Sequence, residues 1–200
     1  MSTGNVTAAK PRTAGVIFRA PLGTTLPTDA TSNLASAYKA LGHIGEDGFT
    51  NSNTATSEDI RDMGGSVVMT VQTEKEDKFS CKLIDALDIE VQKAIYGEDN
   101  VDGTINTGLT ISVNADEPEE AVWVLDTVMR NGVLQRIVIP DGKISELGEI
   151  AYKRDEAVGY DVTITALPDN AGNSHYIYMG VTSGQSGQSG TSGTSGTSGH

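Results

Sequence analysis

Segments in which apolar and polar residues alternate at period two recur along most of the chain. The clearest unit is Asn131-Gly132, which separates the apolar runs 121–130 and 133–139. Both residues of such a turn take a positive φ, which Asn and Gly tolerate, so the pair predicts a β-hairpin. Alternation and turn residues together predict strands in the ranges 15–20, 38–44, 66–73, 78–84, 107–113, 121–130, 133–139, 144–152, 158–167 and 175–181. The sequence therefore predicts a mainly β fold.

One segment, residues 85–96, has the periodicity of an amphipathic helix. Asp85 or Asp88 can cap its start, and Gly97 suits the left-handed position just past its end. A helix of this size packs on a sheet. We expect the core to draw on the apolar residues of the helix and strands: Val67, Met69, Val71, Cys81, Leu83, Leu87, Val91, Trp123 and Leu125.

The stretch 45–65 is polar and acidic, with almost no apolar content, and it predicts a long loop. Loops of this length are uncommon in compact domains and tend to be functional or to become ordered on a partner. The following strands, 66–73 and 78–84, predict a hairpin with the charged segment 74–77 at its tip. Pro140-Asp141-Gly142 predicts another turn. The long loop is a first indication of assembly.

Composition divides the chain into one β domain and two appendages. Residues 1–14 are small and polar and predict an N-terminal arm, and the domain follows over 15–182. From 183 to 200, a Gly/Ser/Thr repeat of period three predicts a flexible linker or tail.

The charge balance argues against nucleic-acid binding. Lys and Arg total 14 and Asp and Glu total 27, a formal net charge of −13. Such a chain has few cations to release counterions from nucleic-acid phosphate, but it suits a surface that DNA must slide past. No apolar run has the length of a membrane span, and the first residues lack a signal peptide's apolar stretch, so we expect cytoplasmic synthesis and no membrane partner.

Motifs of catalysis and metal binding are missing from the sequence. The three histidines, His43, His175 and His200, are far apart, and no P-loop or dinucleotide fingerprint occurs. Two oxygen-rich segments, 99–103 and 169–173, leave calcium binding open, although Asp, Asn and Gly also build tight turns. The single cysteine, Cys81, is expected to be a buried apolar residue. We expect no enzyme, no metal and no cofactor.

The order of these elements resembles the major tail tube proteins of siphophages, the phages with long non-contractile tails, especially those that infect actinobacteria. Four segments carry the resemblance: the first strand with its Thr/Pro-rich continuation at 15–31, the acidic stretch leading through hairpin and helix at 58–97, the tryptophan hairpin at 121–140, and the segment 148–169. Together they fall within residues 15–181.

The resemblance implies a fold of two packed antiparallel sheets, a β-sandwich or barrel, with one flanking helix. It implies six subunits in a ring, and rings stacked into a hollow tube that conducts DNA into the host. The partners would be further copies of the chain, a tape measure protein, a tail terminator and baseplate or tip proteins. The protein would reside in the virion tail after assembly in the bacterial cytoplasm.

The resemblance also implies that rings stack through loops and terminal arms, and the matching candidates here are the arm 1–14, the loop 45–65 and the segment 168–182. Within the loop, the candidate inter-ring contacts are Glu46, Asp47, Asn51, Glu58, Asp59, Arg61 and Asp62. Candidate lumen-facing acids are Glu74, Glu76 and Asp77, for which an ordinary solvated turn is the alternative. For the whole chain, the alternatives are a β-sandwich binding module and a capsid or decoration protein.

Overall fold

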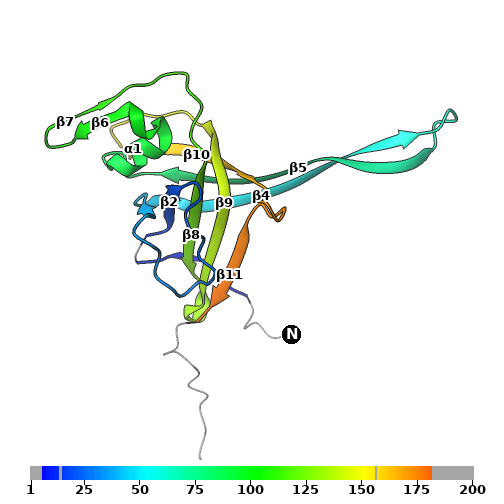
Figure 1. Ribbon diagram of the computed structural model, residues 1–200, viewed down its shortest axis with the longest axis horizontal. Coiled ribbons are helices and arrows are strands. Elements are labelled where there is room, and N and C mark those ends of the chain that lie inside the picture. The colour runs from blue at the N-terminus through cyan, green and yellow to red at the C-terminus, as the bar shows by residue number, and fades with distance from the viewer. Residues whose placement is uncertain (1–5, 14, 156, 182–200) are drawn as a thin grey trace, which may run out of the picture.

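The computed structural model describes residues 6–13, 15–155 and 157–181. This part of the chain is mainly β, with two antiparallel sheets and one α-helix, which confirms the predicted fold class (Figure 1). The strands are β1 (Lys10–Pro11), β2 (Ile17–Pro21), β3 (Lys39–Ala40), β4 (Ile44–Arg61), β5 (Val67–Leu83), β6 (Val101–Thr104), β7 (Gly108–Ile111), β8 (Ala121–Val128), β9 (Leu134–Leu147), β10 (Tyr160–Leu167) and β11 (Tyr176–Gly180). The helix is α1 (Ile89–Tyr96), and short 3-10 turns are η2 (Glu98–Asn100) and η3 (Arg130–Gly132).

The large sheet has the strand order β3-β2-β8-β9-β10-β5-β4, with β1 beside β8 and β11 beside β9. The small sheet is the hairpin β6-β7. The large sheet does not close on itself, so its path ends at two open edges, β3 and β4. Of the predicted turns, Asn131-Gly132 is present, and both residues have a positive φ, 66° and 75°.

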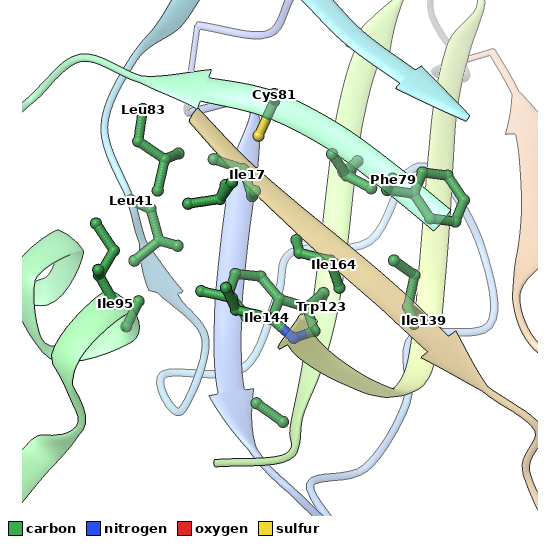
Figure 2. Close-up of a cluster of buried hydrophobic side chains, with 14 of the residues drawn as sticks. Ile17, Leu41, Phe79, Cys81, Leu83, Ile95, Trp123, Ile139, Ile144 and Ile164 are labelled. Carbon is green, nitrogen blue, oxygen red and sulfur yellow. The ribbon is translucent and has the colours of Figure 1, made fainter. Parts of the chain in front are cut away.

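The main core lies on one face of the large sheet, where α1 and strands β2, β5, β8, β9 and β10 converge (Figure 2). Trp123 lies at its centre, fully buried, and its Nε1 donates to the Gly142 carbonyl oxygen at 2.9 Å. Cys81, Leu83, Val91 and Leu125 are buried in the same cluster. Apolar side chains at every second position of these strands therefore build the core.

A second core lies on the opposite face of β2, β8 and β9. Phe18, Val122, Val124 and Val138 belong to it. The segment 22–38 covers these side chains with Leu26, Leu34 and Tyr38. Strand β8 is therefore buried on both faces, which explains its almost continuous run of apolar residues.

Helix α1 begins later than the sequence predicts. Asp88, one of the two predicted caps, accepts a hydrogen bond from the Glu90 backbone N–H at 2.9 Å, and Gly97 ends the helix with φ 94°. The expected core position of Leu87 is wrong, because this residue precedes the first turn and is 75% exposed. Asp85 instead accepts hydrogen bonds from the His43 backbone and ring.

The predicted loop 45–65 is wrong, because these residues form most of β4 and pair with β5 from Phe49 to Arg61. The predicted hairpin tip at 74–77 is wrong for the same reason, since these residues lie within β5. The turn is at Asp62–Ser66, where the Asp62 carboxylate accepts from the Ser66 backbone N–H and Gly65 takes φ 87°. Val67, Met69 and Val71, expected in the core, are 41–57% exposed in the subunit.

The predicted turn at 140–142 is also wrong, because β9 continues through it, with a shift in its register against β8 between Ile139 and Gly142. Gly142 lies where the strand passes over Trp123, and a Cβ atom there would be 2.7 Å from the indole Cδ1. This close approach explains the glycine: it makes room for the tryptophan, and the chain does not reverse here.

Candidate assembly surface

The hairpin formed by β4 and β5 extends far beyond the body of the subunit (Figure 1). Every residue from 50 to 76 is exposed on both faces of this ribbon. Within the described chain, β4 pairs only with β5, and β10 covers β5 only from Lys78 to Leu83. Both backbone edges of the projecting part are therefore open. An isolated two-stranded ribbon is marginally stable in water, so this hairpin has the properties of a structure completed by a partner.

The two faces of the hairpin differ in charge. Residues directly opposite each other in an antiparallel ladder share a face. The pairs Thr56–Glu74, Thr54–Glu76 and Glu58–Val71 place three carboxylates on one side, which we call the acidic face. Lys78 lies on it as well and forms an ion pair with Glu76 at 3.1 Å. The opposite face carries one basic and one acidic side chain among six residues: Ala55, Ser57, Asp59, Thr70, Gln72 and Lys75.

Large apolar side chains gather at the end of the hairpin. Met63 is fully exposed in the turn, and Val68 and Met69 are 63% and 57% exposed. We call this group the apolar tip; it consists of Ile60, Met63, Val67, Val68, Met69 and Val71. Exposed apolar side chains gathered on a projecting element are typical of an interaction site.

The expected inter-ring residues are spread along the whole of β4. Glu46 and Asp47 lie near its base, whereas Glu58, Asp59 and Arg61 lie near its end. Asp59 accepts a hydrogen bond from the Thr70 hydroxyl and forms an ion pair with Arg61 at 3.3 Å. Asp62 stabilises the turn. All of them except Asp62 lie on β4, but they do not converge on one site.

Of the expected lumen-facing acids, Glu74 and Glu76 are exposed on the acidic face. The assignment of Asp77 is wrong, because its side chain is only 2% exposed at the root of the hairpin. Its carboxylate is held by His175 Nδ1 at 2.5 Å and accepts from Asn51 Nδ2 at 2.7 Å. The His175 ring also meets Phe79 edge to face. We call Asn51, Asp77 and His175 the root clamp.

A buried ionic network ties the N-terminal arm and the segment 22–38 to the sheet. Arg136 is 1% exposed and binds Asp126 through two nitrogens at 2.7 and 2.8 Å. Arg12 reaches the same carboxylate at 2.9 Å, and β1 pairs with β8 beside it, so the described part of the arm is attached to the sheet. Sequence reasoning missed this pair, although counting outward from Asn131-Gly132 places Asp126 nearly opposite Arg136.

The same arginine organises the covering segment 22–38. Arg136 Nη1 donates to the carbonyl oxygens of Asp29 and Ser32, both at 3.0 Å. The Asp29 carboxylate accepts from the backbone N–H groups of Ser32 and Thr31, and these bonds hold its pKa well below the usual range. A closed polar turn therefore lies directly over the buried guanidinium.

Where the large sheet stays open, an apolar groove of about 560 Å³ lies between β1 and the first residues of β4. We call it the seam groove. Its walls include Lys10, Pro11, Val16, Ile44, Phe49 and Ile137. Among the described residues, no cluster of His, Cys, Asp and Glu could hold a metal ion. In the segment 169–173, Asp169 accepts from the Ala171 and Asn173 backbone N–H groups, the pattern of a tight turn.

The sequence of the chain matches a known family. Residues 3–186 match the sequence model of the phage tail tube protein family. The chain belongs to the phage tail tube proteins. This family relationship confirms the resemblance, makes the protein a structural component of the phage tail, and implies a role other than catalysis.

Among solved structures, the chain is similar to the cap that terminates the tube of the anti-feeding prophage, determined by cryo-EM. The two share 8% sequence identity, with 90% of this chain and 100% of that chain covered and a TM-score of 0.43. The search among curated proteins finds no match. In the part of the chain that the structure describes, no helix has the length and apolarity to cross a membrane.

Proposed function

We propose that this tail tube protein forms hexameric rings that stack into the hollow tube of a siphophage tail and conduct DNA into the host. The observation that carries this proposal is the projecting β4–β5 hairpin, whose two edges have no partner within the described subunit. A second copy offers the same unpaired edges. Pairing of neighbouring copies removes the exposed edges and closes the open sheet into a ring.

The acidic face of the hairpin suits the inner wall of such a tube. Glu58, Glu74 and Glu76 are exposed on one side of the ribbon, and the chain has a net charge of −13. In a narrow lumen these carboxylates repel DNA phosphates, so the genome passes without sticking. The proposed lumen-facing acids are therefore Glu58, Glu74 and Glu76. Asp77 is not one of them, because its side chain is buried.

The other partners follow from a tube with two ends. A tape measure protein would fill the lumen during assembly, a terminator would close one end, and tip or baseplate proteins would close the other. Assembly would take place in the host cytoplasm, and the subunit would perform no catalysis.

The test is a hairpin truncation. Residues 55–75, all exposed in the subunit, are replaced by Asn-Gly, which closes the Thr54–Glu76 pair with a two-residue turn. Both proteins are concentrated and imaged by negative-stain electron microscopy. We expect rings or tubes from the full chain, and from the truncated chain a folded monomer whose circular dichroism and melting temperature resemble those of the full chain. A full chain that stays monomeric at every concentration, or tubes from the truncated chain, would contradict the proposal.

A further inference from the structure

A cavity of about 350 Å³ lies where helix α1 meets the open β3 edge of the large sheet. Arg19 of β2, Lys39 of β3 and Lys93 of α1 line it. The chain as a whole has 14 lysines and arginines against 27 acidic residues and a net charge of −13. Three cations from three elements around one cavity are therefore a local exception to the acidic character of the chain.

The main core supports the base of this cavity. Leu41, which lines it, is 1% exposed and belongs to the same buried cluster as Ile95 of α1 (Figure 2). The Leu41 backbone N–H also donates to the Ile17 carbonyl oxygen of β2 at 3.0 Å. Helix and sheet edge are thus packed against each other, and the elements that carry the three cations are fixed relative to one another.

Two of the cations lie directly opposite each other in the sheet. Arg19 pairs with Lys39 between β2 and β3, and directly paired residues share a face. Like charges in such a position repel each other and destabilise an antiparallel ladder. Strand β3 has two residues, so this pair is half of its contact with β2. An anion beside the two side chains would replace the repulsion with attraction.

Hydrogen bonds within the described chain leave much of the Arg19 guanidinium unused. Its side chain is 11% exposed, and its Nη2 donates to Glu119 at 2.9 Å. Its Nη1 lies 3.7 Å from Glu98 Oε1, which is beyond hydrogen-bond distance. Its Nε is buried and finds no acceptor among the residues that the structure describes. Buried donors without acceptors are costly, so Arg19 lacks acceptors that a bound anion would add.

The two lysines are available to a ligand as well. Over the described ranges, neither Lys39 nor Lys93 forms an ion pair. Glu90 and Glu98 also line the cavity, but the three cations outnumber them. Glu98 is 54% exposed and makes no hydrogen bond to Arg19, so it can turn into solvent when another anion approaches.

We propose that this cavity binds a phosphate dianion, held by Arg19, Lys39 and Lys93. A tetrahedral phosphate has enough acceptor oxygens for all three side chains, whereas a carboxylate has two. Guanidinium groups match phosphate geometry, and lysines add positive charge. The bound ion neutralises the repulsion between Arg19 and Lys39 and ties α1 to the sheet edge. This inference concerns the single subunit, so it does not depend on the proposed tube function.

The first test titrates inorganic phosphate into dispersed subunits at mildly alkaline pH, with sodium chloride added to keep the ionic strength constant. The melting temperature should rise, because a ligand that binds only the folded state stabilises it. Backbone amide NMR signals of residues 36–41 and of Lys93 should shift along one saturation curve, which gives the Kd. Signals that do not shift, or that shift without saturation, would overturn the inference.

The second test removes positive charge from the cavity. Lys39→Gln combined with Lys93→Gln should raise the Kd for phosphate at least about tenfold, since two charged donors are lost. Neither lysine is fully buried, so circular dichroism should show an unchanged fold. The control combines Lys10→Gln with Lys75→Gln, which removes the same charge from exposed positions outside the cavity. An unchanged Kd in the cavity variant, or an equal rise in the control, would overturn the inference.

A third variant should change the affinity in the opposite direction. Glu98→Gln removes a carboxylate that lines the cavity and attracts Arg19, so the Kd for phosphate should fall at least about threefold. Weaker phosphate binding in this variant would contradict the assignment of the cavity. Because all three measurements use dispersed subunits, their failure would leave the proposed tube function standing, and a chain that binds phosphate but never assembles would contradict that function alone.

Discussion

At the scale of single residues, Gly142 shows how close packing determines one position. The strand passes so near Trp123 that a Cβ at residue 142 would lie 2.7 Å from the indole Cδ1 and 3.1 Å from a methyl carbon of Ile164. We expect Gly142→Ala to lower the free energy of unfolding by about 1–3 kcal/mol, the usual cost of overpacking a core. Urea denaturation measures the change.

The matched control is Gly180→Ala in β11. A Cβ there would be 3.4 Å from a Thr31 methyl carbon, which is close to ordinary contact, and Gly180 does not have a positive φ. Its effect should stay within about 0.5 kcal/mol. Equal stability losses in the two variants would show that the Trp123 contact does not determine position 142.

The second prediction at this scale concerns the reactivity of the Cys81 thiol. Burial raises the pKa of its thiol from 9.0 to about 12, and Asp161 adds to the rise. The folded chain thus retains its thiol proton where the unfolded chain loses it, so this group's contribution to stability falls as pH rises from about 9 to about 12. At pH 8 we expect folded Cys81 to resist Ellman's reagent and the denatured chain to react.

Met63→Cys supplies the positive control for this measurement, because residue 63 is fully exposed in the turn. Its additional thiol should react at once in the folded protein. If native Cys81 reacted at the same rate as this exposed thiol, the core around β5 would be open to solvent.

At the scale of elements, the root clamp holds the base of the hairpin to the segment before β11. Without the His175 ring, the buried Asp77 carboxylate would retain Asn51 as its hydrogen-bond donor among the contacts described above. We expect His175→Ala to cost about 1–3 kcal/mol, the penalty for a buried polar group that loses a partner. Thermal or urea unfolding measures the effect.

His43→Ala is the control, because His43 also contacts a carboxylate, Asp85, but its side chain is 82% exposed. Exposed pairs contribute at most about 1 kcal/mol. The clamp would be unimportant for the fold if both histidine variants unfolded at the same denaturant concentration.

At the scale of the whole molecule, the strands that cover a core were predictable and the projecting hairpin was not. Alternating side chains identify β10 and β11, and Asn131-Gly132 locates the turn between β8 and β9. Residues 50–61 lack this signal because both faces of β4 are in solvent, so no face needs to be apolar. Apolar residues do alternate with other residues in 67–71, but Val67, Met69 and Val71 lie on an exposed surface and not in the core.

The acidic residues along the hairpin illustrate the same limit. Glu74, Glu76 and Asp77 are neighbours in sequence, yet two lie on an open face and one is buried under His175. The register between β4 and β5 and the path of the chain before β11 determine which of these three side chains are exposed and which is buried. Family resemblance identified the type of protein because it depends on the order of elements, which is insensitive to where each strand ends.

The central claim is that other copies of this chain complete the open edges of the β4–β5 hairpin. Hydrogen exchange, measured residue by residue in dispersed subunits and in concentrated, assembled protein, tests it directly. We predict that the outward-pointing amides between Asn51 and Asp77 exchange at least about a hundredfold more slowly after assembly, since new strand partners occupy them. Hairpin amides that exchange equally fast in both states, while tubes are visible in the same sample, would contradict the claim.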